Sequence, residues 1–439
     1  MATGCLMSLV AALHGVVRKL VADPLCVVYV RGKPGEGLVT GYQPALGRRA
    51  GVTWPVVSAS LSDDVLSTPG LEAAVRSLDR AELEGDWPGV LRSPRLGLTI
   101  RWFPADPALP GLAGALFPVP GSRLFAALSE ACRSRVVRIV AVPVEYKPGL
   151  RCVIRYDVAT TRTPLVVFGK VYPDVAQATA THRLTARLWQ PGPSAAPLVP
   201  RPLDLLPELP LTLAEAARGV GGTRVLRPST PPDRLDEAVA AAARALSWLH
   251  ARDVPAGLEA RPLGSRFAAR AAGWLADLER HAPGEAPDLA SACRDLLCAL
   301  PDLRADPLRV VHGEFRASQL IFCRPGRVVI TDLDTACLGD PAFDVGCLMA
   351  YLRPPALWRG SADACAWFRA AREKFLDAYG ADDALRRRAA LYEAVFVLKN
   401  VSRRTRNVNS PRPRELRLAA REIHACLGAA EPVRAPALA

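Results

Sequence analysis

The spacing of apolar positions along the chain predicts a mixed protein whose second half is mainly helical. Apolar residues at helical spacing predict helices at residues 1–21, 72–83, 175–190, 235–251, 265–279, 287–300, 343–351, 362–379, 382–401 and 412–427. Short runs rich in β-branched residues predict strands within residues 26–42, 96–103, 136–146, 150–158 and 164–172. Lys-Pro-Gly turns interrupt two of these strand regions, because Pro and Gly break both periodicities.

Proline-rich stretches separate these elements into parts. Residues 104–120 and 191–210 carry many prolines and are expected to be connections. The predicted organisation is an N-terminal α+β extension over residues 1–130, a strand-rich part with its connection over 131–220, a helical part over 221–427 and a tail over 428–439. The tail is rich in Pro and Ala, and we expect it to be disordered.

The main candidate for a functional site lies between Arg309 and Leu352, where a polar loop with a carboxylate follows a short apolar run. Two short apolar runs on either side of a Pro-Gly turn predict a β-hairpin over residues 320–331. Glu314 and Gln319 precede the first strand, and Asp332 follows the second, so a tight hairpin brings the three side chains together. Carboxylate and amide oxygens are hard ligands, so this group predicts a Mg²⁺ and proton-transfer site.

The same stretch carries a family resemblance. The sequence H-G-E-F-R-A-S-Q, from His312 to Gln319, is followed by I-T-D-L-D and then by G-D-P-A-F-D, from Gly339 to Asp344. It resembles the catalytic loop and metal-binding segment of the aminoglycoside phosphotransferase family, whose usual forms are H-G-D-x-x-x-x-N and I-D-[FW]. The resemblance covers residues 136 to 427 and implies a bilobal, protein-kinase-like fold with a β-rich N-lobe and a helical C-lobe.

The resemblance also implies roles for four residues. Members of the family are small-molecule kinases, which implies ATP as co-substrate and Mg²⁺ as cofactor. Lys170 would hold the nucleotide phosphates, Asp332 would bind Mg²⁺ with Gln319 as the second oxygen ligand, and Glu314 would accept the proton of the acceptor hydroxyl. Lys170 lies within an apolar strand, so an edge position or a snorkelling side chain is the alternative interpretation.

Other polar residues of the stretch are expected to support the site. His312 is expected to brace the loop by hydrogen bonds. Asp334 is interpreted as a turn cap, with a second metal contact as the alternative. Asp340 and Asp344 are expected to cap the next helix and tie it to the loop. His250, at the end of the long helix 235–251, is expected to be a packed or capping histidine, because no zinc-like spacing surrounds it.

Two of the four site residues differ from the family pattern. Glu314 stands where the family has Asp, and Gln319 stands where it usually has Asn. Each change adds one methylene, so the charge or oxygen donor is kept while the geometry shifts.

The nucleotide side differs as well. The helix 175–190 contains no Glu to pair with Lys170, and Gln177 and His182 are its polar candidates. The glycine-rich loop is reduced to the turn Lys147-Pro148-Gly149, which has backbone N–H groups to offer to phosphate. Two functions follow: an ATP-dependent transfer of the γ-phosphate to a hydroxyl of a small molecule, or a catalytically impaired pseudokinase that binds nucleotide or a partner.

The composition of the chain narrows the classes of molecule that it is expected to bind. The net charge is +13, yet only six of the 56 basic residues are lysines, and the arginines are spread along the chain. Aromatic residues make up 6% of the sequence, so the pattern does not favour a nucleic-acid surface. Arginines gather at 386–388 and 403–406 in the last helices, which argues against a polycationic acceptor. Residues 211–219 resemble the hinge of the family, with an ordinary connection as the alternative.

Cysteine usage and hydropathy indicate the compartment. The eleven cysteines form no C-x-x-C pair, and many lie in apolar surroundings, as expected for reduced thiols. No window has eighteen uninterrupted apolar residues, so no membrane span is predicted. The expectation is a cytoplasmic enzyme with a small-molecule hydroxyl substrate and no nucleic-acid or membrane partner.

Overall fold

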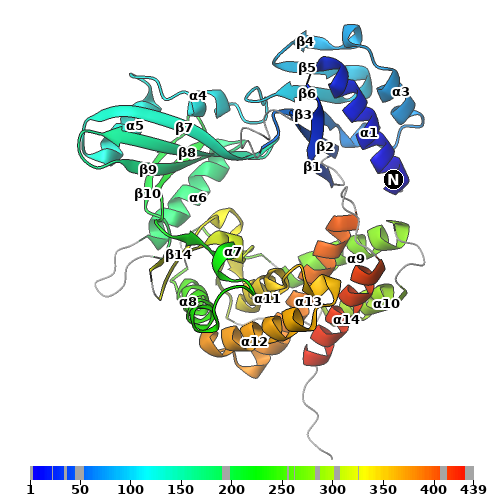
Figure 1. The fold of residues 1–439 in the computed structure, drawn as a ribbon, viewed down its shortest axis with the longest axis vertical. Coiled ribbons are helices and arrows are strands. Elements are labelled where there is room, and N and C mark those ends of the chain that lie inside the picture. The colour runs from blue at the N-terminus through cyan, green and yellow to red at the C-terminus, as the bar shows by residue number, and fades with distance from the viewer. Residues whose placement is uncertain are drawn as a thin grey trace, which may run out of the picture. The chain divides into compact units, whose positions relative to one another are not determined.

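The computed structural model in Figure 1 divides into two compact units. The first consists mainly of residues 1–186 and 201–216, and the second of residues 187–200, 217–405 and 409–439. The residues that the structure describes are 3–21, 23–33, 37–44, 54–189, 198–254, 257–261, 263–281, 287–300, 307–324, 326–405 and 413–430. The domain boundaries predicted at residues 130 and 220 stay predictions.

The first unit begins with a six-stranded antiparallel sheet in the order β1-β2-β3-β6-β5-β4. Its strands are β1 (Leu25–Lys33), β2 (Gly37–Pro44), β3 (Val57–Leu61), β4 (Glu84–Asp86), β5 (Val90–Ser93) and β6 (Leu98–Trp102). Two helices, α1 (Thr3–Leu20) and α3 (Leu71–Ser77), pack with it. Leu13 and Val17 of α1 share a buried core with Leu38, Tyr42 and Ile100 of the sheet.

The first unit continues with a five-stranded antiparallel sheet in the order β10-β11-β9-β8-β7. Its strands are β7 (Val136–Lys147), β8 (Arg151–Thr160), β9 (Leu165–Val171), β10 (Pro202–Leu206) and β11 (Leu211–Glu215). The helices of this part are α4 (Leu112–Leu116), α5 (Arg123–Cys132) and α6 (Val175–Leu188). Side chains of α4 and α5, such as Leu112 and Leu128, pack with Ile154, Tyr156 and Leu213 on one face of the sheet.

Several elements of the first unit differ from the sequence expectation. The helix expected over 72–83 ends at Ser77, and the side chain of Asp79 caps a separate 3₁₀ turn, η2 (Arg80–Glu82). The expected connection 104–120 contains α4, and the expected connection 191–210 contains β10. The expected hinge begins as β11, because Leu211 and Leu213 alternate into the core. The two expected connections and the expected hinge thus contain regular structure that their local sequence does not predict, whereas the expected helix 72–83 is shorter.

The second unit is mainly helical. Its helices are α7 (Gly222–Val225), α8 (Pro232–His250), α9 (Leu263–His281), α10 (Pro287–Ala299), α11 (Pro341–Leu352), α12 (Ala362–Tyr379), α13 (Asp383–Thr405) and α14 (Pro413–Ala430). A small sheet joins β12 (Val220–Gly221), β14 (Leu320–Arg324) and β15 (Arg327–Ile330), and β13 (Arg309–Val311) pairs with β16 (Cys337–Gly339). The hairpin predicted over residues 320–331 is therefore present, and the α+β fold class is confirmed.

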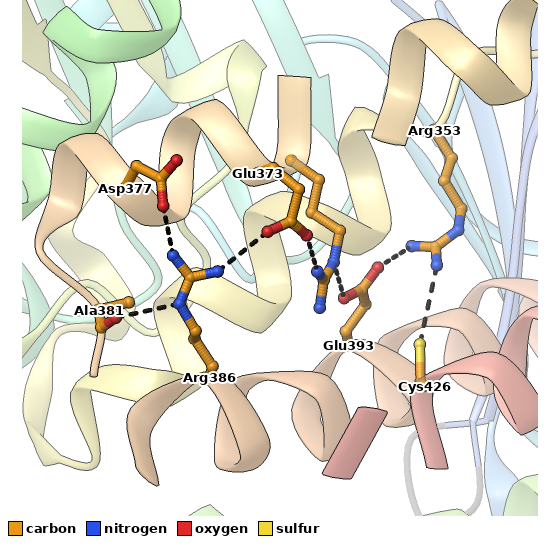
Figure 2. A network of polar contacts seen from close by, with 8 residues as sticks. Arg353, Glu373, Asp377, Ala381, Arg386, Glu393 and Cys426 are labelled. Carbon is orange, nitrogen blue, oxygen red and sulfur yellow. Dashed lines mark hydrogen bonds and ion pairs between the residues drawn. The ribbon is translucent and has the colours of Figure 1, made fainter. Parts of the chain in front are cut away.

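A buried ion network joins the last four helices, as Figure 2 shows. Arg353, which follows α11, and Glu393 of α13 have only 2% and 1% of their side chains exposed and lie 2.7 Å apart. Glu393 also pairs with Arg372 of α12, and Arg353 pairs with Glu422 of α14. The network continues to the surface of α12 and α13 through Glu373, Arg386 and Asp377. Positive and negative groups alternate along it, so each buried charge has a partner.

Helix α14 corrects the predicted tail. It extends to Ala430, so residues 428–430 are helical, and residues 431–439 lie outside the described part. The cysteines that the structure describes form no disulfide. None of the described helices combines the length and the apolar character needed to cross a membrane.

Candidate active site

The loop after β13 is held by a glycine and a histidine. Gly313 has φ +78°, and a Cβ at this position would lie 2.4 Å from the carbonyl oxygen of Thr335, so only glycine fits without a shift. His312 is fully buried. Its Nε2 donates to the carbonyl oxygen of Thr331 at 2.8 Å, and its Nδ1 accepts from the backbone N–H of Glu314 at 3.2 Å. These bonds give His312 the bracing role that the sequence predicted.

A buried carboxylate ties this loop to helix α11. Asp344 accepts hydrogen bonds from the backbone N–H groups of His312 and Gly313, at 2.5 and 2.9 Å. His250 at the end of α8 lies 3.2 Å from the same carboxylate through Nε2, and its Nδ1 lies 2.7 Å from the hydroxyl of Tyr379. The loop is therefore fixed by two helices that are distant in sequence.

The neighbouring acid has a different task. Asp340 caps α11 by accepting from the backbone N–H of Ala342 at 3.0 Å, and Arg388 of α13 donates to its other oxygen at 2.9 Å. The sequence expected both Asp340 and Asp344 to cap and to tie. The structure gives the cap to Asp340 and the tie to Asp344.

The hairpin brings two of the predicted site residues into contact. The side-chain amide of Gln319 donates to Oδ2 of Asp332 at 3.0 Å. The backbone of Gln319 is fixed by Thr331, whose N–H and hydroxyl both donate to its carbonyl oxygen. Asp332 adopts the left-handed conformation, with φ +65°, at the start of the 3₁₀ turn η6 (Leu333–Thr335). The predicted convergence of these two side chains therefore exists.

This pair has the chemistry of a Mg²⁺ site. Mg²⁺ in phosphoryl-transfer enzymes is bound by one or two protein oxygens, with water and substrate phosphates as the other ligands. A carboxylate and an amide group in contact fit that donor set, and an amide whose oxygen and nitrogen are exchanged presents the oxygen instead. Among the described residues there is no cluster of three or more His, Cys, Asp or Glu side chains suited to a metal. The donor set of this pair suits an ion whose other ligands are water and nucleotide phosphates.

Glu314 lies in the same loop with its carboxylate partly accessible. Its side chain is 27% exposed, and Nη2 of Arg316 lies 3.5 Å from its Oε2. The ring of His312 accepts from its backbone N–H, so the main chain is fixed while the carboxylate extends outward. A reachable carboxylate on a fixed loop is suited to accept a proton.

Lys170 lies in the first unit, on the face of the five-stranded sheet opposite the core. Its register partners are Val153 of β8 and Thr212 of β11. Phe168 and Val142 belong to the same face and are each 37% exposed. The Nζ of Lys170 lies 5.5 Å from the ring centroid of Tyr172. A lysine on an accessible apolar face is suited to a ligand with a flat base and phosphates.

Helix α6 supplies no carboxylate for Lys170. Gln177 is exposed, and its backbone N–H is capped by Asp174. His182 is half-buried, and burial lowers its pKa, against the opposing charge of Asp204. Neither side chain is an anion, so the departure noted in the sequence remains in the structure.

The Lys147-Pro148-Gly149 turn differs from its predicted use. The backbone N–H of Gly149 donates to Oδ2 of Asp106 at 2.7 Å, and the hydroxyl of Tyr146 donates to the same oxygen at 2.9 Å. Nη1 of Arg101 in β6 lies 3.8 Å from the other oxygen of this buried carboxylate. The Gly149 N–H is therefore already bonded and is not offered to phosphate. Asp106 lies in a Pro-rich segment with no motif, so no sequence pattern predicted this contact.

Comparison with protein families shows the family of the chain. The APH model, described as the phosphotransferase enzyme family, matches residues 154–392. This match covers more than half of the chain. The protein belongs to the phosphotransferase enzyme family. The matched segment includes Lys170, Glu314, Gln319 and Asp332, and residues 1–153 lie outside it.

Solved structures are similar to this phosphotransferase family member at low identity. A putative aminoglycoside phosphotransferase from Ralstonia eutropha JMP134 is 16% identical, with a TM-score of 0.44, over 70% of this chain and 96% of that one. A choline/ethanolamine kinase family protein from Mesorhizobium loti is 17% identical, with a TM-score of 0.42, over 63% and 85%. Aminoglycoside phosphotransferase APH(4)-Ia is 16% identical, with a TM-score of 0.45, over 70% and 99%. No curated protein sequence matches the chain.

Proposed function

We propose that this member of the phosphotransferase enzyme family transfers the γ-phosphate of ATP to a hydroxyl group of a small molecule. The observation that carries the proposal is the contact between Gln319 and Asp332 in the hairpin that follows the Glu314 loop. Family membership supports the transfer of a phosphoryl group. The loop contacts of His312 and Asp344 support a site whose parts are held in place before substrate arrives.

Each of the four site residues has a role that its chemistry supports. Lys170 binds nucleotide phosphates, and the apolar face around it receives the base. Asp332 and Gln319 hold Mg²⁺, which supplies positive charge to the phosphate oxygens as they are transferred. Glu314 accepts the proton of the acceptor hydroxyl, whose oxygen forms a bond to the γ-phosphorus. The bond from that phosphorus to the bridging oxygen breaks, and ADP leaves with the bond's electrons.

The substitution Asp332→Asn tests this proposal most directly. Because the change removes a charged metal ligand but keeps the size of the side chain, we expect Mg²⁺-dependent ADP production to fall by at least about a hundredfold. Asp334→Asn, two residues further on, is the matched control, since its proposed task is to cap a turn and an amide also caps. ADP production is measured against a panel of hydroxyl compounds, with nucleotide affinity titrated with and without Mg²⁺.

The outcomes separate the two functions left open by the sequence. Unchanged turnover in Asp332→Asn would remove the metal assignment, whereas an equal loss in Asp334→Asn would favour the alternative in which Asp334 is a second metal contact. Mg²⁺-dependent nucleotide binding by the wild type with no ADP production for any compound would favour the pseudokinase that binds without transfer. Absence of nucleotide binding would reject ATP-dependent transfer and would leave only a pseudokinase that binds a partner.

A further inference from the structure

Glu314 belongs to a group of charged residues in which three side chains are basic. Arg316 belongs to the same loop, and Lys399 and Arg403 lie one turn apart on helix α13. We call Arg316, Lys399 and Arg403 the basic cluster. All of its residues lie in the second unit, so their arrangement is described within one compact body.

Arg316 contacts the proposed proton acceptor, and Lys399 interacts with it electrostatically. Arg403 is exposed and interacts electrostatically with Lys399 and Tyr351. Nη2 of Arg316 lies 3.5 Å from Oε2 of Glu314, and its guanidinium lies 5.4 Å from the ring centroid of Tyr351 in α11. The Nζ of Lys399 lies 5.0 Å from the ring centroid of Phe396. Within the described residues, the Tyr351 hydroxyl and Nε of Arg316 are buried and have no hydrogen-bond partner. These atoms keep bonding capacity for a ligand.

Among the strongest electrostatic partners of Lys399 in the described part of the chain, positive groups outnumber carboxylates. The strongest electrostatic partners of Lys399 are Cys347, Glu314, Arg403 and Arg316, and Glu314 is the only carboxylate among them. Burial raises the pKa of the Cys347 thiol well above its ordinary value, so this thiol is neutral near pH 7. Lys399 therefore has two cations and one carboxylate among its strongest partners, which leaves a local excess of positive charge.

This excess of positive charge destabilises the folded protein. Burial lowers the pKa of Lys399, and the nearby charges of Arg403 and Arg316 act in the same direction, against Cys347 and Glu314. A charged ammonium in such a place is held at the expense of stability unless an anion joins it. A positively charged acceptor that brings its hydroxyl to Glu314 would enter the same field and be repelled.

We propose that the basic cluster binds an anionic group, a carboxylate or phosphate, on the hydroxyl compound that this enzyme phosphorylates. The inference rests on the proposed transfer function and adds the chemical class of the acceptor. The anion bonds to the ammonium of Lys399 and the guanidinium groups of Arg316 and Arg403, and the Tyr351 hydroxyl adds a neutral donor. The acceptor hydroxyl then lies within reach of Glu314.

Acceptors that differ in charge but share a scaffold test this assignment. Glucosamine, glucose and glucuronate carry positive, zero and negative charge on the same ring, and choline, glycerol and glycerate form a second series. Turnover is measured as ADP production, and binding is measured by calorimetry with ADP and Mg²⁺ present. We expect the anionic member of a series to give the highest kcat/KM, or the tightest binding where turnover is absent.

The variant Lys399→Met links that preference to the cluster. Methionine keeps the contact with Phe396 and removes the charge. We expect the KM or Kd of the anionic compound to rise about ten- to a hundredfold, as for the loss of one charge-assisted hydrogen bond, while the KM for ATP stays constant. Lys374→Met is the control, because Lys374 lies half-exposed on α12 and pairs with Asp236 outside the site.

Every outcome decides the assignment. Preference for the neutral or cationic compounds would overturn it, as would equal effects of Lys399→Met and Lys374→Met, or no binding and no turnover for any anionic compound. A rise in the KM for ATP instead would assign the cluster to the transferred phosphoryl group. Turnover of cationic compounds alone would leave the transfer function standing without this inference. Lys399-dependent anion binding without any ADP production would leave the inference standing without transfer.

Discussion

Helix α13 carries two groups of charged residues that follow opposite rules. Near its middle, Glu393 joins Arg353 and Arg372 in the buried network, where each cation lies beside an anion. Near its end, Lys399 and Arg403 belong to the basic cluster. Burial alone lowers the pKa of Arg353, but Glu393, Cys426 and Glu422 raise it further than burial lowers it. At Lys399, burial prevails and the pKa is lowered.

The comparison distinguishes charges that stabilise the fold from charges that we propose to bind a ligand. The paired network connects four helices, and each of its buried groups has been compensated within the protein. The basic cluster uses similar residues on the same helix but leaves positive charge unbalanced, next to a carboxylate in the loop that carries the family motif. A count of arginines in the sequence treats both groups alike, whereas the positions of the acids distinguish them.

The charges assigned to function are tested by removing Glu314, and this substitution has the largest expected effect. Glu314→Gln removes the proton acceptor, and we expect kcat to fall about 10²- to 10⁴-fold, the usual contribution of a positioned base. Because Glu314 also opposes the positive charge at Lys399, we expect a lower melting temperature for Glu314→Gln than for Glu314→Asp. Glu314→Asp keeps the carboxylate and should retain most of the activity. Equal activity of Glu314→Gln and wild type would remove Glu314 from the chemistry.

The charges assigned to stability are tested by removing Glu393, and this substitution has the next largest expected effect. Glu393→Gln leaves Arg353 and Arg372 without their shared buried carboxylate, and we expect a loss of about 3–5 kcal/mol in the free energy of unfolding. Denaturant titration measures it. Glu373→Gln in the same network is the control, since its side chain is 56% exposed and its loss should cost less than about 1 kcal/mol. Similar values for the two variants would show that the buried network does not carry the stability.

The smallest expected effect is the change with pH in the stability difference between Lys399→Met and the wild type. The folded-state pKa of Lys399 lies below its ordinary value of 10.5, so the unfolded state binds its proton more strongly. The charge therefore destabilises the native protein fully at pH values below the folded pKa, and the penalty is relieved as pH rises from that pKa to 10.5. Lys399→Met should melt slightly higher than wild type at pH 7, and the difference should shrink toward pH 10.5. A variant less stable than wild type at pH 7 would show that Lys399 supports the fold.

Much of the hairpin site was predictable because its information is local. The distance from Glu314 to Gln319 is five residues, and the Pro-Gly turn returns the chain to Asp332, so period and turn chemistry were enough to place the last two in contact. The prediction that all three side chains converge goes further, and the contact recorded for the Glu314 carboxylate is with Arg316. Metal ligation by Asp332 and phosphate binding by Lys170 stay predictions.

Contacts between distant segments were not predictable in the same way. Asp106 bonds Gly149 across 43 residues, and this bond removes an N–H that the turn would have offered to phosphate. β10 forms in a segment whose prolines suggested a connection, because β11 offers it a partner. The local sequence shows which hydrogen-bonding groups a residue has, whereas the tertiary structure shows which of these groups already have a partner.

The sequence by itself determined the α+β class, the hairpin and the phosphotransferase motif, since these depend on short periods and on residues a few positions apart. Only the tertiary structure decided which charges are balanced. Arg353 and Glu393 are forty residues apart, Arg353 and Glu422 are 69 residues apart, and Arg316 and Lys399 lie further apart still. Electrostatic interactions depend on distance in space and on burial. For that reason the fold alone separates the paired network from the basic cluster beside Glu314.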